Sequence, residues 1–384
     1  MKPRLLILSF YDISIDPRVM KQVRRFANDY DVTTCGPGPR PHPLVTHVEL
    51  DPSFVPHRGR MRQYLDERAR ERENFAWTYR RLPIVVQTRQ LLSGKQFDAA
   101  IANDADAVGI ASELVGAKRV HADLHEFFPG LPQPDSKLGR RQTRYWEWLV
   151  RTHCAPAASA TTVGKLIAER YVAYGVHSGV VTNASPPQRL AAHTTRYPIR
   201  LVHSGNPFRD RGLESIMRAV ARTQVEVTLD LYLMKQNVAE LAEVVELSAM
   251  LGPRITVHDP VTQDRLIETL NTYDVGIHVL PPTSENNALA LPNKFFDFVQ
   301  ARLGVIVGPS PEMALTVREH DLGWVTESFE EDAIVRVLDS LTPSAVDARK
   351  HASDAAAFEL SAQTQVEGWA DAIAQIVKTQ GTRS

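Results

Sequence analysis

The sequence has few cysteines and almost no net charge, and each of these features excludes a class of protein. Two cysteines, Cys35 and Cys154, are too few for a disulfide framework, a four-cysteine zinc site or an iron–sulfur cluster, and they suit a reducing compartment. The 44 basic and 45 acidic residues give a formal charge of -1, so we expect no nucleic-acid partner. No apolar run is long enough to span a membrane, and the N-terminal stretch lacks the length and cleavage site of a signal peptide. These absences predict a cytoplasmic globular protein.

Motifs for common cofactors are missing as well. Gly36-Pro37-Gly38 begins like a dinucleotide-binding loop, but it lacks the third glycine and the following helix. His125-Glu126 begins like a zinc-binding motif, but Pro129 stands where the second histidine is needed. The other histidines show no ligand spacing, and neither a phosphate-binding G-x-x-x-x-G-K loop nor a G-x-S-x-G motif occurs. We therefore predict no metal and no bound cofactor.

The 384 residues are enough for two domains, and charge divides them unevenly. Residues 1–185 contain 26 basic and 19 acidic residues, a net of +7, whereas residues 186–384 contain 18 and 26, a net of -8. The proline-bearing stretch before residue 188 is typical of a domain boundary. We predict an N-terminal domain at 1–185, a C-terminal domain at 186–362, and a helix and tail at 363–384 that pack back toward the N-terminal domain.

Short apolar strands alternate with helical stretches through both halves. Strands are expected at residues 4–9, 30–35, 45–50, 97–102, 119–122, 160–163 and 178–182, and again at 199–203, 227–233, 255–258, 275–280, 305–308 and 324–325. Repeated strand–helix units predict an α/β fold with two doubly wound, Rossmann-like domains. Ligands of such sheets bind at the carboxyl ends of the strands, so candidate site residues are expected there.

Several segments, taken in order, resemble one family. Residues 199–212, IRLVHSGNPFRDRG, are similar to the opening of the donor domain in GT-B glycosyltransferases of family 4, and residues 291–301, LPNKFFDFVQA, are similar to a later helix of that domain. Segments 14–19, 102–104, 123–126 and 180–186 resemble its acceptor-domain and interdomain signatures. The resemblance implies two domains facing a cleft, a nucleoside-diphosphate-sugar donor, a glycan, glycolipid or small glycoside acceptor, retention of configuration and no metal.

The resemblance also implies roles for individual residues. Arg211 and Lys294, each near the start of a helix, would stabilise the charge that grows on the leaving diphosphate. Asp297 would hydrogen-bond the donor ribose, and His125 would face the transferred sugar with Glu126 orienting it. The remaining donor-site candidates are Gly205, Asn206, Asn293 and Glu285.

Purely structural roles are alternatives for several of these residues. Lys294 and Asp297 fit a surface ion pair at i,i+3, and Gly205 fits a simple turn after a strand. Asp16 before Pro17 fits a helix N-cap, whereas Arg18 is a candidate for an acceptor phosphate.

Departures from the family pattern keep other functions open. Asn206 replaces an arginine of the family, and Leu289 stands where its first paired glutamate is expected. A non-catalytic GT-B protein that binds a sugar nucleotide or supports a partner enzyme is therefore an alternative. An epimerase of the same fold and a two-domain binding protein are further ones.

Two basic, aromatic segments lie in the first half. Residues 137–151 combine five basic residues with three aromatic ones, and residues 58–81 contain eight arginines against four acids. This composition suits an interfacial helix, so we expect the first domain to contact an anionic acceptor or, peripherally, the inner face of a membrane. The alternative is that Trp146 and Trp148 pack in the core, because residues two apart on a helix do not share a face.

Overall fold

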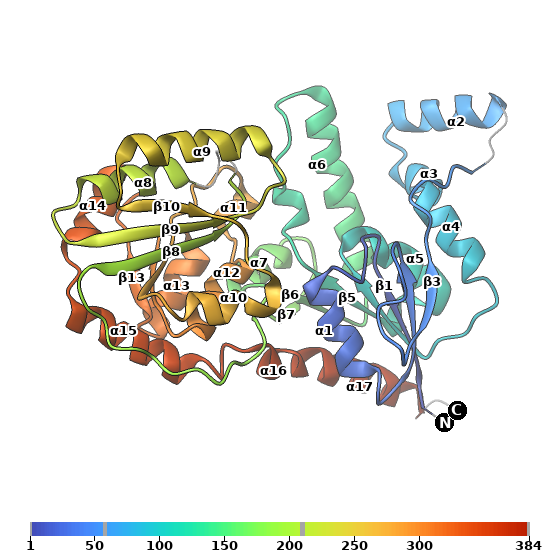
Figure 1. The fold of residues 1–384 in the computed structure, drawn as a ribbon. Coiled ribbons are helices and arrows are strands. Elements are labelled where there is room, and N and C mark those ends of the chain that lie inside the picture. The colour runs from blue at the N-terminus through green and yellow to red at the C-terminus, as the bar shows by residue number, and fades with distance from the viewer. Residues whose placement is uncertain (1, 57–59, 208–211, 382–384) are drawn as a thin grey trace. The chain divides into compact units, whose positions relative to one another are not determined.

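The computed structural model describes residues 2–56, 60–207 and 212–381, which form two compact units (Figure 1). The first unit contains Met1–Val181 and Val366–Ser384, and the second contains Thr182–Gln365. The chain therefore passes between the units twice, at Val181–Thr182 and at Gln365–Val366. The boundaries expected from the sequence lie within a few residues of these two passages.

A parallel sheet forms the centre of each unit. The strands of the first sheet are β1 (Arg4–Leu8), β2 (Asp31–Gly36), β3 (Thr46–Glu49), β4 (Ala99–Asn103), β5 (Val120–Leu124), β6 (Ser159–Thr162) and β7 (Ser178–Val180). Those of the second are β8 (Ile199–Gly205), β9 (Val227–Leu233), β10 (Ile255–His258), β11 (Val275–His278), β12 (Gly304–Val307) and β13 (Gly323–Val325). Their spatial orders are β3-β2-β1-β4-β5-β6-β7 and β10-β9-β8-β11-β12-β13. The order reverses beside the first strand of each sheet, between β1 and β4 and between β8 and β11, which is where doubly wound sheets bind ligands.

Helices connect these strands. The first unit has α1 (Pro17–Phe26), α2 (Arg60–Glu71), α3 (Phe75–Arg80), α4 (Pro83–Leu91), α5 (Ala105–Val115), α6 (Lys137–Leu149), α7 (Lys165–Val172) and α17 (Glu367–Gly381), with shorter turns η1 (Ala117–Arg119), η2 (Phe128–Gly130) and η3 (Val150–Cys154). The second has α8 (Leu213–Arg222), α9 (Val238–Leu251), α10 (Gln263–Leu270), α11 (Glu285–Ala288), α12 (Asn293–Gln300), α13 (Pro311–Glu319), α14 (Glu331–Asp339), α15 (Pro343–Ala356) and α16 (Ala362–Gln365).

One apolar cluster of the first unit joins its sheet to α1 and α17. Leu5 and Ile7 of β1 belong to it, since residues two apart on a strand share a face. From α17 come Trp369, Ile373 and Ile376, all at most 4% exposed. Figure 1 shows the red helix α17 beside the blue helix α1. The core of the first unit is thus completed by a segment that follows the whole second unit in the sequence.

The second sheet is covered on both faces. Leu201 of β8 belongs to a cluster with α8 and α14, whereas its neighbour Val202 belongs to a cluster with α12 and α13. In β12, Ile306 joins the first cluster and Val305 the second. Burial on both faces explains why these strands read as continuous apolar runs rather than alternating ones.

The start of α1 follows the sequence prediction. Asp16 is the N-cap, and its carboxylate accepts hydrogen bonds from the backbone N–H groups of Arg18 and Val19. Pro17 occupies the first helical position, where its missing N–H costs nothing. The N-cap interpretation of Asp16 is therefore confirmed.

Candidate functional site

Polar side chains gather at the carboxyl edge of the first sheet, beside its reversal point. Asn103 ends β4, Asp104 follows it, and His125 comes directly after β5. Strand β5 extends two residues beyond the predicted end, so that Asp123 lies inside it and is fully buried. A charged residue in a buried strand needs compensation, and the surrounding side chains supply it.

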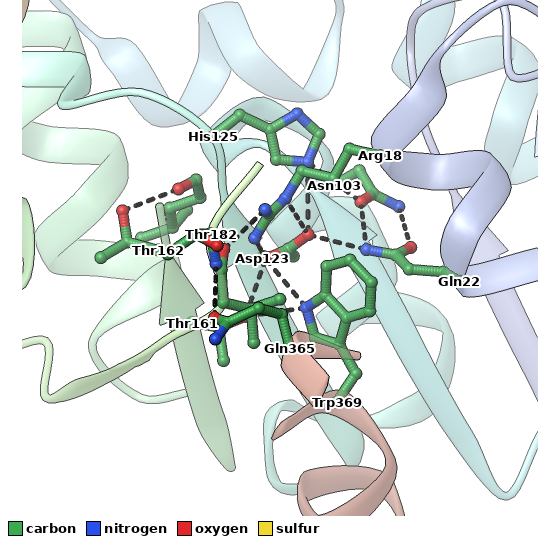
Figure 2. Close-up of polar contacts among 12 residues, drawn as sticks. Arg18, Gln22, Asn103, Asp123, His125, Thr161, Thr162, Thr182, Gln365 and Trp369 are labelled. Carbon is green, nitrogen blue, oxygen red and sulfur yellow. Dashed lines mark hydrogen bonds and ion pairs between the residues drawn. The ribbon is translucent and has the colours of Figure 1, made fainter. Parts of the chain in front are cut away.

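His125 is held by its neighbours on both ring nitrogens. Its Nε2 lies 3.3 Å from Asp123 Oδ2 and 3.2 Å from Asn103 Oδ1 (Figure 2). Its Nδ1 lies 3.5 Å from Asp104 Oδ2. Burial alone would lower the pKa of His125, but the two carboxylates outweigh it and raise that pKa above its ordinary value. The groups that orient the ring in this structure are Asp104 and Asp123. Glu126 is exposed, and its expected role in orienting the ring stays a prediction.

Asp123 is fixed by an arginine fork. Arg18 donates from Nε and Nη2 to its two carboxylate oxygens, at 2.8 and 2.6 Å, and Gln22 donates to Oδ2 at 2.7 Å. Burial alone would raise the pKa of Asp123, but Arg18 and His125 hold it well below its usual range. Arg18 is 4% exposed, so the expectation that it meets an acceptor phosphate is wrong. Its guanidinium is instead hydrogen-bonded to the buried Asp123 carboxylate.

Asp104 is a site residue that the sequence indicates only as a member of the segment 102–104. Its backbone has φ +68° and ψ +158°, a region that almost only glycine adopts without strain. This conformation lets its carboxylate accept a hydrogen bond from the His125 N–H at 3.1 Å. Two positions on, Asp106 is half-buried, and burial raises its pKa to about 7. An Asn-Asp pair at the end of a buried strand is the signal that identifies this corner.

The second sheet presents a cation at the equivalent edge. Lys294 is the second residue of α12, and its Nζ lies 3.3 Å from Nε2 of buried His203 in β8. His203 Nδ1 lies 2.8 Å from the Ile277 carbonyl, which only accepts, so Nδ1 carries the proton and Nε2 accepts from the ammonium. A Cβ on Gly205 would lie 2.6 Å from Nζ, so any larger residue there would shift the ammonium from this position. The sequence interpretation missed His203.

The other predicted donor-site residues differ in their surroundings. Asn206 directly follows β8 and is half-buried, whereas Asn293 and Glu285 are exposed at the first positions of α12 and α11. Asp297 is only 3% exposed and accepts a hydrogen bond from Ser185 Oγ at 2.5 Å. The Asp297 carboxylate therefore lies in the interior of the second unit and not on its surface. Arg211 lies outside the described residues.

The basic, aromatic helix α6 packs its rings within the first unit. The ring centre of Trp146 lies 4.9 Å from that of Phe128. The ring centre of Trp148 lies 5.9 Å from that of Tyr145 and 5.3 Å from that of His153. Among its arginines, Arg144 is paired with Glu73 and Arg140 with Asp135. The predicted membrane contact through this helix is therefore not supported.

In residues 2–56, 60–207 and 212–381, no three His, Cys, Asp or Glu side chains are grouped so that they could hold a metal ion. None of the helices in these ranges combines the length and apolar character that crossing a bilayer requires.

Comparison with known proteins places the fold. No family model matches the chain, and no curated protein is similar to it in sequence. Solved structures are similar over the full length. A sucrose-phosphate synthase from Thermosynechococcus elongatus matches with a TM-score of 0.71 and 11% identity over 100% of both chains. A glycosyltransferase from Rickettsia africae matches with 0.69 and 10% identity over 98% of this chain and 99% of that one. HepE from Anabaena, in complex with UDP-glucose, matches with 0.65 and 12% identity over 99% and 100%. The chain therefore has the GT-B fold of these glycosyltransferases, with two parallel-sheet α/β domains.

Proposed function

We propose that this chain is a glycosyltransferase that moves a sugar from a nucleoside-diphosphate donor, bound by the second unit, to a hydroxyl acceptor bound by the first. The observation that carries the proposal is Lys294 at the N-terminus of α12, beside the end of β8 and next to Gly205. A helix N-terminus and an ammonium both attract anions. The absence of a side chain at Gly205 lets the Lys294 ammonium lie against the backbone at the end of β8.

The chemistry asks for such a cation. When the glycosidic bond to the donor breaks, negative charge grows on the leaving diphosphate, so a fixed positive charge stabilises the transition state more than the ground state. Lys294 supplies this charge in the proposal, and Arg211 is proposed as its partner from the resemblance to family 4. Two cations of this kind remove the need for a metal ion.

His125 is proposed to face the transferred sugar and the acceptor. It lies at the reversal point of the first sheet, and two carboxylates favour its protonated form. A charged imidazolium donates hydrogen bonds from both nitrogens, which suits a sugar hydroxyl. The resemblance to family 4 supports retention of configuration, with the donor phosphate taking the proton of the incoming hydroxyl.

The comparisons support a class of donor, and the motifs support a class of acceptor. The HepE structure contains UDP-glucose, so a UDP-sugar is the first donor to test. We propose a glycan, a glycolipid or a small glycoside as the acceptor. Cys35 and Cys154 are free and buried, which agrees with a reducing cytoplasmic location.

Release of UDP tests the proposal directly. The protein is incubated with UDP-glucose and other UDP-hexoses, with and without a panel of sugar and sugar-phosphate acceptors, and UDP is quantified. Lys294→Ala and Arg211→Ala should each lower turnover strongly while the folded state persists, whereas Lys95→Ala, an exposed lysine, removes the same charge without effect. Full activity in both donor-site variants would refute the assignment.

Binding without transfer is the second candidate function. Leu289, at the position of the family's first paired glutamate, is 5% exposed and offers no carboxylate to the sugar. A protein that binds UDP in calorimetry but releases none from any UDP-sugar would favour this candidate. Conversion of the donor sugar without an acceptor would instead indicate an epimerase.

A further inference from the structure

The Asp123 carboxylate receives more donors than it has lone-pair sites. Its Oδ1 accepts from Arg18 Nη2 at 2.6 Å, Thr161 Oγ1 at 2.7 Å and Trp369 Nε1 at 3.2 Å. Its Oδ2 accepts from Arg18 Nε, from Gln22 Nε2 and from His125 Nε2, which lies 3.3 Å away. A carboxylate offers about four such sites, so these donors compete for its charge. Figure 2 shows the convergence.

Two of the donors lie near the points where the chain passes between the units. Trp369 is in the first turn of α17, directly after the passage at Val366. Arg18 donates from Nη1 to the carbonyl of Val181, the last residue before the first passage, at 2.7 Å. Its guanidinium carbon also lies 4.8 Å from the Trp369 ring centre. Both passages are therefore connected to one carboxylate.

The choice of tryptophan at position 369 is informative. The side chain is fully buried, and an apolar ring would fill this core position as well. Tryptophan adds one N–H group, and this group points to Asp123 and to Thr161 Oγ1, which is also 3.2 Å away. The Thr161 proton goes to Asp123, so Thr161 accepts from Trp369 and from His121 Nε2 at 2.9 Å. Burial lowers the pKa of His121 to about 4, which keeps that histidine neutral and this arrangement intact.

We propose that Trp369 is a positioning residue for His125, acting through the shared Asp123 carboxylate, so that the path of the chain where it re-enters the first unit sets the orientation of the His125 ring. The inference rests on the proposed function only for the role of His125 in transfer. The contact itself is a property of the first unit alone.

The charged groups around His125 decide the direction of the effect. Asp104 and Asp106 face it from the start of α5, Asp123 from β5, and Arg18 from α1. The carboxylates favour the protonated ring, and Arg18 opposes it. If the indole N–H is removed, Asp123 has one donor fewer and binds the His125 proton more strongly. The pKa of His125 should then rise.

Histidine and indole NMR on the full chain tests this. The His125 ring is assigned by His125→Gln and titrated in the wild type, in Trp369→Phe and in Ile373→Val. Ile373 is buried on the same helix, but its shortening removes no hydrogen bond. We expect an upward shift of the His125 midpoint in Trp369→Phe and none in Ile373→Val. The wild-type Trp369 indole N–H resonance should titrate with the same midpoint as His125, because both groups bind one carboxylate.

Turnover gives the functional readout. With a working donor and acceptor, Trp369→Phe should lower kcat by about tenfold at an unchanged donor KM, because a displaced ring misaligns the reacting groups. An unchanged His125 midpoint together with an indole resonance that ignores the His125 titration would overturn the proposal. If Trp369→Phe does not fold, the wild-type indole titration decides alone, since the other four of the five tryptophans can be assigned by their own substitutions. Absence of transfer in the wild type would refute the proposed function and leave the titration result standing.

Discussion

Replacing Gly205 by alanine tests whether the end of β8 brings Lys294 to the donor site. The new Cβ would lie 2.6 Å from the Nζ of Lys294 and 3.2 Å from its Cε. Because side chains do not approach so closely, the ammonium has to move away. The residue also has φ +139°, which an L-amino acid rarely adopts.

The two effects have separate magnitudes. The strained backbone should cost about 1–3 kcal/mol of the free energy of unfolding. Displacing Lys294 removes a charge-assisted contact to phosphate, worth about 1.5–3 kcal/mol, which corresponds to about 10- to 150-fold in the affinity for UDP. The affinity loss is thus expected on top of the stability loss.

Calorimetric titration with UDP and urea unfolding separate these terms when Gly94→Ala is the control. Gly94 also has a positive φ, +77°, but a Cβ there meets no heavy atom within 4 Å. Gly94→Ala should therefore lose stability and keep its UDP affinity. If Gly205→Ala binds UDP as tightly as Gly94→Ala does, Lys294 does not act on the donor and the reasoning fails.

Four further predictions concern the other groups of the site. His125→Gln should lower kcat, and in urea unfolding it should destabilise the protein more at about pH 5 than at about pH 9. A raised histidine pKa stabilises the folded state at pH values below the ordinary histidine pKa, and this contribution is lost as the pH rises through the folded-state pKa. Equal losses of stability at both pH values would contradict this prediction. Burial raises the pKa of Asp106 to about 7 from 3.8, so the wild type loses stability as the pH rises through this window. Asp106→Asn should therefore gain relative stability above about pH 7 but not below about pH 4. A pH-independent difference in thermal unfolding would show that the pKa of Asp106 is not raised in the folded state. Asp297→Glu adds a methylene at a site that is 3% exposed, and should cost about 1–3 kcal/mol in chemical unfolding, whereas a neutral effect would place the carboxylate in solvent. Activity should persist in excess chelator, and its loss with recovery on adding manganese or magnesium would overturn the metal-free mechanism.

The alternation of strands and helices could be predicted because buried parallel strands appear in the sequence as short, continuous apolar runs, which differ clearly from the helical stretches between them. The predicted ranges 227–233 and 255–258 coincide with β9 and β10. The predicted strand at 119–122 stops short, since Asp123 reads as a loop residue until its ion pair with Arg18 is known. A single sequence does not reveal that a carboxylate will be neutralised by a residue 105 positions away.

The candidate site divides in the same way. Lys294 at a helix start and His125 after a strand are visible because local pattern places both at strand or helix ends. The contact between Lys294 and His203 is not, because it joins residues 91 positions apart. The contact of Trp369 with Asp123 could not be predicted either, because the sequence pattern of a C-terminal helix indicates only that its tryptophan packs in the core.

The docking of α17 has a consequence for how the chain acquires its structure. Trp369, Ile373 and Ile376 fill the face of the first sheet beside α1, and burying each such side chain is worth about 1.5–3 kcal/mol. During synthesis this face stays uncovered until the whole second unit has been made. A fragment that ends at Val181 would expose the same apolar face, so we expect it to aggregate unless residues 366–381 are supplied as a separate peptide.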